Sequence, residues 1–597
     1  MNSTNRKLGL ALGALAAGMA LSAPLSVAAF GLRVDTNRDG VVDVVGLSDE
    51  PGKRTWTATR GAILLPNIGD TPLRCPRTAD SSVSDDQLEA CHDAADNVPR
   101  ATQNFAPVRT LPVADATSAH VGRVQAVGRG ADKVRLFVQR GNAWVHLGPG
   151  STLTLKELRS GAVLGADARD VMRNPSVWDG RVTLELVLSG PGGERRDQVE
   201  MRVAPIVVYN HTQDATQVFV PRSGGQQAHT QFVTDLQQAL ADSGFTQPLG
   251  RLNTVDTWAQ DFVEFGYVAM PLPGGNSAML QIAIRSPQPG RRGGRSVFDL
   301  RGPGMGAVQT GGDDYHQVDS FGNLETIPPY TLNGKHYPVG RIVYGDAGDG
   351  LAPHPDMRQF FAAQEVQSPI VLDTSWLVIG HVDEFVQFLP ADTPRGWRVA
   401  IADVEAGLAL LRDAQARGHG GVKAYSVSGR GAPQATIDEL LADEAFLRAN
   451  ALASAKIAEN LALLQRETGL TIAEVIGVPT LFETASFGPP ELAGPSPGAG
   501  AGPRAPERIV YGPGTLIAAY PAAINGLLLD RRSYIAPRQW GPLIDGRDVL
   551  QAAVDAAYAR AGITVRYVDD WRSHHVIGGE VHCGTNTTRR GRAVWWR

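Results

Sequence analysis

The feature that most constrains the fold is a change of pattern near residue 204. Residues 30–200 consist of short strand-like runs, such as "KVRLFVQR" and "VTLELVLSGP", separated by Gly, Asp and Asn turns. From "APIVVYN" onward, apolar strands alternate with helical segments such as "QFVTDLQQALADSG". We therefore expect an all-β sandwich over 30–200 and an α/β domain over 201–597.

The first 29 residues are predicted to be a signal peptide. Arg6 and Lys7 precede the apolar run "LGLALGALAAGMAL", and Ala28 and Ala29 suit a cleavage site. An uncleaved anchor is the alternative, but the run is short for a membrane span. Later segments lack the ~18 consecutive apolar residues of a membrane helix. We expect an exported chain, secreted or periplasmic, with no membrane span after cleavage.

The charge balance argues against a nucleic-acid partner. Lys and Arg number 56 against 61 Asp and Glu, which gives a formal net charge of -5. Proteins that bind nucleic acids or anionic membranes instead carry basic surpluses or polybasic runs.

The chain has three cysteines, Cys75, Cys91 and Cys583. In an oxidising compartment an even set tends to pair, and Cys75 and Cys91 lie close together in a polar stretch. We predict that they form a disulfide. It would close a loop of roughly 15 residues, worth about 3 kcal/mol in the chain-entropy model. Cys583 is then left over as a reactive thiol or, alternatively, as a buried inert cysteine.

The segment "VDTNRDGVVD" resembles the first half of a calcium loop. It places the side-chain oxygens of Asp35, Asn37 and Asp39 at alternate positions before Gly40. Gly46 stands where such a loop should carry a bidentate Glu. The alternative is an Asx turn within a β-hairpin, and the local pattern fits both interpretations equally.

The run "SWLVIGHVDEFVQFLP" (375–390) has the pattern of a strand buried on both faces, yet it contains His381, Asp383 and Glu384. Burying an unpaired charge costs several kcal/mol, so such groups are normally paired, bound to metal or functional. If the backbone is extended, His381 and Asp383 share one face and Glu384 lies on the other. A structural His–Asp pair is the alternative for this segment taken alone.

Two distant segments add further reactive groups, Asp261 in "TWAQDFVEFGYVAM" and Cys583 in "GGEVHCGTN". A cysteine protease needs at most one carboxylate, whereas two carboxylates suit a planar, forked guanidinium. We interpret Asp261 and Asp383 as clamps for a guanidinium whose carbon is attacked by the Cys583 thiolate, with His381 as acid and base. His582 is a rival base, but neighbours on an extended backbone face opposite ways.

Five segments resemble the protein-arginine deiminase family: "WAQDFVEFGY", "DSFGNLE", "SWLVIGHVDEF", "GPLIDGRDVL" and "EVHCGTN". The likeness covers most of 200–597, and "VDTNRDGVVD" with "KRTWTATRGAILLPN" resembles the family's middle domain. We expect no counterpart of the additional N-terminal domain of the vertebrate members. The resemblance implies an α/β five-bladed propeller (pentein, guanidine-modifying superfamily) after an all-β immunoglobulin-like domain.

The resemblance also implies a reaction. This is the calcium-dependent hydrolysis of peptidyl-arginine to peptidyl-citrulline and ammonia, through a covalent thiouronium intermediate on Cys583. It implies that His381 is the general acid and base and that Asp261 and Asp383 hold the guanidinium. The implied substrate contacts come from Trp258 and Ile379 beside the aliphatic stem, and from Arg291 or Arg292 on the substrate backbone.

The calcium ligands implied by the resemblance form two groups. Beneath the active centre they are Gln260, Glu264, Phe321, Leu324 and Glu325, with Phe321 and Leu324 acting through backbone carbonyls. In the β-rich region they are Asp35, Asn37 and Asp39. Extended spacing independently predicts that Gln260 and Glu264 face away from Asp261.

The sequence also departs from the family pattern. A second calcium site in the catalytic domain is expected to be absent, because Phe262 and Arg285 stand where it needs acids. Ile577 replaces an arginine at the substrate mouth, which bears on extended peptide specificity.

Two alternatives to a deiminase of arginine-containing proteins or peptides follow from the same residues. One is a deiminase of free guanidines such as arginine or agmatine. The lesser one is a secreted, inactive β-sandwich adhesin.

Overall fold

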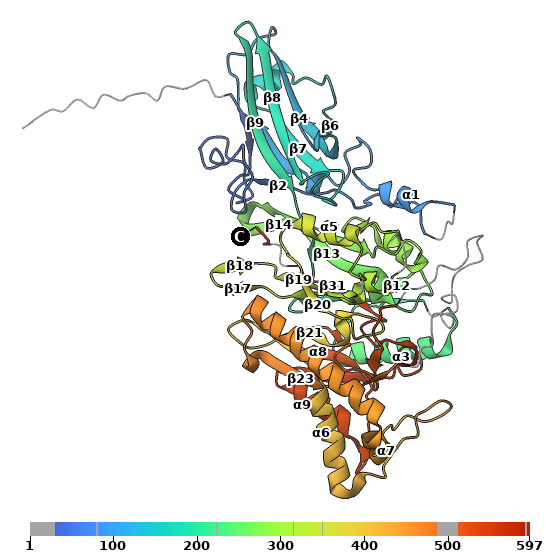
Figure 1. Cartoon of the computed structure of the whole chain (residues 1–597). Coiled ribbons are helices and arrows are strands. Elements are labelled where there is room, and N and C mark those ends of the chain that lie inside the picture. Colours follow the sequence, from blue (N-terminus) through green and yellow to red (C-terminus); the bar gives the residue numbers. More distant parts are fainter. Residues whose placement is uncertain are drawn as a thin grey trace, which may run out of the picture.

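The computed structural model describes residues 30–78, 82–222, 224–313, 316–348, 350–485, 511–591 and 594–596. The predicted signal peptide lies outside them. Figure 1 shows a narrow β-rich region stacked on a wider region that contains most of the helices. Among the described residues, no helix is both long enough and apolar enough to cross a membrane.

The N-terminal region is built from two sheets whose buried side chains belong to one hydrophobic core. One sheet has the order β1 (Leu32–Val34), β3 (Ala106–Thr110), β7 (Val163–Ala168), β5 (Val134–Arg140) and β6 (Ala143–His146). The other has the order β2 (Ala62–Leu64), β9 (Gly193–Val203), β8 (Arg181–Gly190) and β4 (Val121–Val127). Exposed and buried residues alternate at the start of β4, as expected for a strand with one face on the core. The region is thus all-β apart from short helices such as α1 (Asp85–Ala90) and α2 (Leu155–Ser160).

A buried ion pair ties β5 to β7. Arg135 donates from Nε and Nη2 to the two oxygens of Asp167 at 2.9 and 2.6 Å, and both side chains are 0% exposed. Asn67 donates a third hydrogen bond to the same carboxylate, and the remaining Arg135 nitrogen donates to backbone carbonyls. Both charges are therefore satisfied from within the fold.

The structure also pairs Cys75 with Cys91 in a disulfide, while Cys583 is a free, buried thiol.

The C-terminal region contains, among its described residues, five sheets that share one pairing pattern. In each sheet a central strand is antiparallel to one neighbour and parallel to the other. The central strands are β11 (Ala215–Pro221), β14 (Asn276–Arg285), β19 (Arg341–Asp346), β22 (Trp397–Asp403) and β27 (Ser533–Pro537). The parallel partners are β12 (Gly250–Leu252), β15 (Met305–Gln309), β20 (Ile370–Asp373), β23 (Val475–Pro479) and β30 (Thr564–Val568).

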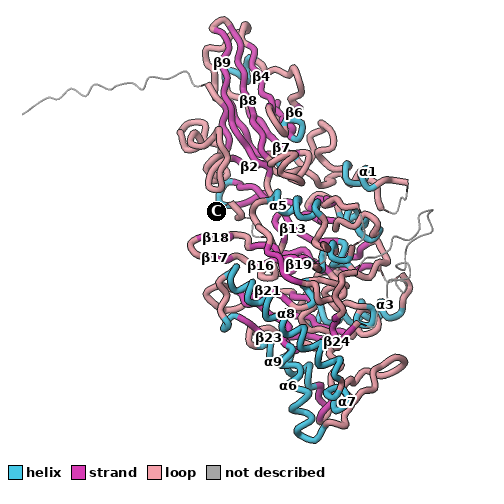
Figure 2. The backbone as a smooth tube through the Cα atoms, viewed as in Figure 1, coloured by secondary structure: helices cyan, strands magenta, loops and turns pink. Residues whose placement is uncertain are grey.

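Helical segments connect each central strand to its parallel partner, because a parallel pair needs a crossover. The main ones are α3 (Gln227–Asp242), a 3₁₀ stretch (Arg292–Leu300), α5 (Pro355–Gln364), α6 (Val404–Ala414) with α7 (Ile437–Ala442) and α8 (Glu444–Thr468), and α9 (Val549–Ala559). Figure 2 shows this cyan helical layer around the magenta strands of the lower region.

The antiparallel partners are β31 (Asn586–Arg589), β13 (Val263–Leu272), β16 (Leu324–Ile327), β21 (Val386–Pro390) and β26 (Leu527–Leu528). A turn immediately before each of these strands carries a residue of the site described below. These residues are Cys583, Asp261, Phe321, Asp383 and Asn525. The repeated pairing pattern thus gathers segments that are far apart in the sequence.

The two regions also contact each other. The Trp595 ring stacks on Trp56 with centroids 6.4 Å apart, and the chain ends at the boundary between the regions (Figure 1). Gly40 has φ of +84°, and a Cβ there would lie 2.0 Å from the backbone of Leu272. The acidic loop around Gly40 therefore abuts the turn after β13.

The prediction of one strand over 375–390 is wrong. Only β21 is a strand there, and Val382–Glu384 forms a 3₁₀ turn capped by His381. The Glu384 carboxylate accepts a hydrogen bond from the His381 amide at 2.8 Å, which holds the turn closed. The alternation of faces assumed for an extended backbone therefore does not apply to these residues. Likewise, Asp261 lies in the short helix α4 (Ala259–Phe262) and not in a strand.

Candidate active site

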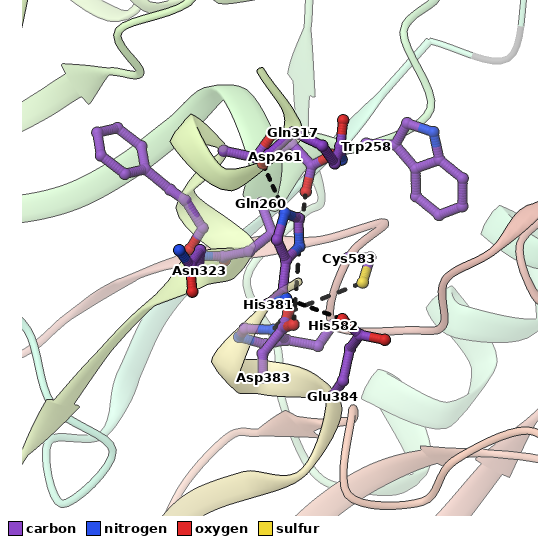
Figure 3. Close-up of polar contacts among 12 residues, drawn as sticks. Trp258, Gln260, Asp261, Gln317, Asn323, His381, Asp383, Glu384, His582 and Cys583 are labelled. Carbon is purple, nitrogen blue, oxygen red and sulfur yellow. Dashed lines mark hydrogen bonds and ion pairs between the residues drawn. The ribbon is translucent and has the colours of Figure 1, made fainter. Parts of the chain in front are cut away.

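Two buried carboxylates flank His381. Asp261 Oδ1 and Asp383 Oδ1 each lie 4.0 Å from His381 Nδ1 (Figure 3). Both oxygens are buried and have no hydrogen-bond partner. His381 Nε2 contacts the Gln317 carbonyl at 2.8 Å, which fixes the ring. A buried carboxylate oxygen without a donor is costly, so a cationic ligand that donates to both atoms would be stabilised here.

Glycine is required beside this ring. A Cβ at Gly322 would lie 2.4 Å from His381 Nδ1 and 3.2 Å from Asp261 Oδ1. Any larger residue at this position would displace the imidazole from the carboxylates.

The second oxygen of each carboxylate is held by the protein. Asp261 Oδ2 accepts from Arg291 Nη1 at 2.9 Å and from Gln317 at 3.2 Å. Asp383 Oδ2 lies 2.9 Å from His582 Nδ1. The carboxylates are thus oriented while one oxygen of each stays unpaired.

The free thiol adjoins the same group. Cys583 Sγ lies 3.7 Å from Asp383 Oδ2 and 3.3 Å from Asn525 Oδ1. The Cys583 amide also donates to Asn525 Oδ1, so one side chain positions both the backbone and the sulfur. Burial raises the pKa of the Cys583 thiol well above its usual value, and Asp383 and Asp261 raise it further. Without a nearby cation the thiol is therefore protonated.

A pocket opens beside the sulfur, and we call it the thiol pocket. Its lining residues are Ile379, His381, Glu384, Ile517, Ala518, Ala522, Asn525, His575, Gly578, Gly579, Glu580 and Cys583. Glu384 therefore faces the pocket, contrary to the expectation that it faces the other way. Burial raises the pKa of Glu384 well above its ordinary value, and the neighbouring Asp383 adds to the shift.

Two predicted substrate contacts border this pocket. Ile379 lines it directly. The Trp258 ring lies edge-on to His574 with centroids 5.4 Å apart, and a Cβ at Gly579 would approach the Trp258 ring to 2.5 Å. Gly579 thus leaves room for the indole beside the pocket.

The two predicted backbone-contacting arginines lie in different environments. Arg291 is 3% exposed and forks onto Asp256 at 2.8 and 3.0 Å while also reaching Asp261. This placement differs from the predicted contact with the substrate backbone, because three carboxylate contacts hold the guanidinium inside the protein. Arg292 is exposed, and its contact with substrate stays a prediction.

A second cavity lies on the other side of Asp383, and we call it the glutamate cavity. It is lined by Tyr209, His211, Gln260, Glu264, Leu324, Glu325, Thr326, Leu527, His582, Thr585, Asn586, Thr587 and Arg589. His582 is oriented toward this cavity and contacts Asp383 from behind, so it does not line the thiol pocket.

The oxygen atoms of the glutamate cavity fit a hard cation such as calcium. The Gln260 amide donates to Glu264 at 2.7 Å and to the Phe321 carbonyl at 3.1 Å, so these predicted ligands already lie together. Burial raises the pKa of Glu264 to about 7 and that of Glu325 to about 8. The negative charge of these two buried carboxylates is poorly balanced by the protein. Together with an amide and backbone carbonyls, they form a donor set that suits calcium.

The acidic loop near the N-terminus forms a turn. Asp35 accepts hydrogen bonds from the amides of Asp39 and Gly40, and Asn37 donates to Asp39. Burial raises the pKa of Asp35 to about 6, and Asp49 and Asp39 contribute to the shift. The Asx-type hydrogen bonds of the alternative interpretation are thus present, alongside carboxylates that lie close enough to repel one another.

The positions that depart from the family pattern have other partners. Phe262 is fully buried, and Arg285 pairs with Asp85 at 2.6 Å. Ile577 is 51% exposed.

Sequence reasoning missed Asn525, Gln317 and His211. Asn525 and Gln317 lie in the stretches "AAINGLLL" and "YHQVDS", which carry no chemical motif. His211 follows Asn210 in a segment that has the pattern of a loop. Of the three, only Asn525 lies just before a short apolar strand, β26 (Leu527–Leu528).

Comparison with known proteins gives one family. The family model described as "Protein-arginine deiminase (PAD)" matches residues 194–597. Protein-arginine deiminase type-4 of Mus musculus is 29% identical over 585 residues, covering 95% of this chain and 82% of that protein. The type-4 enzyme of Rattus norvegicus is 32% identical over 408 residues, or 67% of this chain and 57% of that protein. The type-4 enzyme of Homo sapiens is 32% identical over 414 residues, or 67% of this chain and 56% of that protein.

Proposed function

Because the chain belongs to the protein-arginine deiminase family, we propose that it hydrolyses peptidyl-arginine to peptidyl-citrulline and ammonia. One observation carries this proposal above the others. Two buried carboxylate oxygens, on Asp261 and Asp383, lack donors and lie beside a histidine and a free thiol. A guanidinium provides paired N–H groups and a positive charge, and so supplies what these oxygens lack.

Substrate binding activates the nucleophile. A guanidinium that takes the free oxygens of Asp261 and Asp383 replaces their contact with His381 and neutralises the charges that raise the thiol pKa. The pKa of Cys583 then falls, and the thiol proton passes to His381, which the guanidinium has displaced from the two carboxylates. The aliphatic stem of the substrate lies along Ile379 and Trp258.

The chemistry follows in two halves. The Cys583 thiolate attacks the guanidinium carbon, and His381 protonates the nitrogen that leaves as ammonia. The carbon remains bonded to sulfur as a thiouronium. His381 then takes a proton from water, the hydroxide attacks the same carbon, and the C–S bond breaks to give citrulline and the thiolate. Atoms and charge balance without an oxidant or reductant.

We propose that the activity depends on calcium. Gln260, Glu264, Glu325 and the carbonyls of Phe321 and Leu324 would hold the ion in the glutamate cavity. An ion held there would supply positive charge behind Asp383, which contacts His582 of the same cavity. Asp35, Asn37 and Asp39 form a second proposed site.

We further propose the finer architecture. The repeated pairing of the five small sheets supports a five-bladed propeller over 201–597, and the two N-terminal sheets support an immunoglobulin-like domain over 30–200. Export after removal of residues 1–29 is supported by the Cys75–Cys91 disulfide, since disulfides persist in oxidising compartments.

A citrulline assay tests the proposal. Denatured arginine-rich protein, free arginine and agmatine are compared as substrates, with calcium and with a chelator. We expect citrulline in the protein substrate and its loss on chelation. Activity confined to the free compounds would favour a free-guanidine deiminase, and no activity on any substrate would favour the inactive adhesin. Activity that survives chelation would contradict the calcium dependence alone.

A further inference from the structure

The glutamate cavity contains a cluster that an all-oxygen calcium site does not need. His211 Nδ1 lies 4.0 Å from Glu325 Oε2, and His582 Nε2 lies 3.9 Å from Glu325 Oε1. Within the described residues, this is the one group of three His, Cys, Asp or Glu whose ligand atoms all lie within 4.8 Å of one another. The three residues come from separate turns and strands, so the fold alone brings them together.

The two histidines each present a nitrogen to the cavity. His582 contacts Asp383 through Nδ1 at 2.9 Å, which leaves Nε2 directed at Glu325. A carboxylate behind a histidine is the usual way to orient an imidazole that binds a metal. His211 Nδ1 is buried and lacks a hydrogen-bond partner, and so does Thr326 Oγ1 in the same cavity. These unpartnered polar atoms require a ligand to offset their burial.

The donor set distinguishes between classes of cation. Calcium takes oxygen ligands, whereas two imidazoles and a carboxylate are a common three-ligand set for zinc, with a fourth position left open. A tetrahedral zinc site with bonds of about 2.1 Å places its ligand atoms about 3.4 Å apart. The distances of 3.9 and 4.0 Å therefore need only a small contraction.

We propose that His211, Glu325 and His582 form a binding site for a divalent transition metal of the zinc class. This site is distinct from the calcium ligand set but shares Glu325 with it. One cavity then takes either ion, and zinc competes with calcium. Zinc binding itself does not depend on the proposed activity, whereas the competition rests on the proposed calcium site.

Metal titration of the full chain tests the site. A Cys583→Ser background removes the thiol as a rival ligand, and the chain is stripped with a chelator. Zn²⁺ affinity and stoichiometry are measured by calorimetry, and Co²⁺ is used as a spectroscopic probe. We expect one tight site that His211→Gln weakens by about 100-fold or more, because an amide replaces a ligand nitrogen.

A matched control uses His336→Gln, which removes an exposed histidine from the hairpin of β17 (Tyr330–Leu332) and β18 (Lys335–Tyr337). This variant should bind Zn²⁺ like its parent. If His211→Gln also binds like the parent, or if both variants lose the same weak site, the metal is bound at surface histidines and the proposal is overturned.

Two further measurements do not depend on how a variant folds. X-ray absorption of the zinc-loaded parent should show two imidazoles and oxygen at about 2.0–2.1 Å. Fewer imidazoles would contradict the site. Raising the calcium concentration should weaken the apparent Zn²⁺ affinity, and an unchanged affinity would overturn the shared use of Glu325. If zinc binds as expected but the chain with Cys583 intact forms no citrulline in calcium without zinc, the proposed activity fails while the metal site stands.

Discussion

The N-terminal sheets and the active centre both bury carboxylates, but they treat them differently. The Asp167 carboxylate accepts a bidentate pair of hydrogen bonds from the Arg135 guanidinium and a third from the Asn67 amide, so its charge is balanced within the fold. Asp261 and Asp383 each keep one buried oxygen without a donor. In the first region a guanidinium of the protein pairs with both oxygens of the carboxylate, whereas in the second Arg291 reaches only one oxygen of Asp261.

This difference indicates what each pair does. A satisfied buried pair adds little net stability over an apolar pair, although breaking it is costly. An unsatisfied pair lowers stability until a ligand arrives, and the ligand's binding energy then includes the relief of that penalty. Substitutions that separate stability from activity can therefore test the comparison.

The largest effect is expected from Cys583→Ala. Without the sulfur no thiouronium forms, so the rate of citrulline formation should fall by at least about 10⁴-fold. The unfolding midpoint in urea should change little, because the substitution removes a single buried atom. A variant that kept the parental rate would refute the covalent mechanism.

The next largest fall in the rate of citrulline formation is expected from Asp383→Asn. The amide cannot neutralise a guanidinium, and we expect the rate to fall by about 10²–10³-fold. The urea midpoint should stay the same or rise, because an uncompensated charge leaves the interior. Asp392→Asn, at an exposed position, is the matched control and should change neither quantity. If Asp383→Asn instead lowered the urea midpoint and kept the parental rate, Asp383 would be a structural carboxylate like Asp167.

Asp167→Asn should lower the stability of the fold and leave the activity unchanged. It leaves the Arg135 guanidinium buried without a counter-charge, and we expect a loss of about 3–5 kcal/mol in the free energy of unfolding. Activity per folded molecule should be unchanged, because the pair lies in the other region. The double variant Arg135→Met with Asp167→Leu should recover most of the stability. If it stays as unstable as the single variant, the pair is not balanced as described.

The smallest expected effect concerns pH. Burial raises the pKa of Glu580, a residue of the thiol pocket, to about 8 from an ordinary value of 4.5. Between these values the unfolded chain loses a proton that the folded chain keeps, so stability falls as pH rises through this window. His575, 2.8 Å away, has its pKa lowered to about 4 by burial and stays neutral throughout the window.

Glu580→Gln removes this titration. The free energy of unfolding, measured from pH 5 to pH 8, should decline less in the variant than in the parent. We expect a difference of about 1–3 kcal/mol across the window. Curves that run parallel would show that Glu580 is already ionised in the folded protein.

The sequence predicted which residues of the candidate site lie together better than it predicted their arrangement. His381 and Asp383 could be found because ionisable groups in an apolar run are rare. Asp261 and Cys583 were joined to them by the chemistry of a guanidinium and by the family motifs. The turn at Val382–Glu384 could not, because it is closed by a hydrogen bond that strand periodicity does not encode. The orientation of Glu384 was wrong for the same reason.

The sequence predicted the two regions of the fold, but it did not predict the strand pairing that is repeated in the five small sheets. The shift from short strands to alternating strands and helices located the all-β and α/β parts. The five sheets share backbone pairing rather than side chains, so no repeated motif marks them in the sequence. His211 and Asn525 were missed for a related reason, since their partners lie in other units of the repeat.

The pairing of β31 with β11 has a consequence for biosynthesis. Thr588 on β31 meets Thr216, which lies 372 positions earlier in the chain. A ribosome makes Asp261, His381 and Asp383 long before it makes Cys583, and the strand that closes the first sheet follows only three residues later. The first sheet therefore cannot be completed until the segment that carries Cys583 has been made.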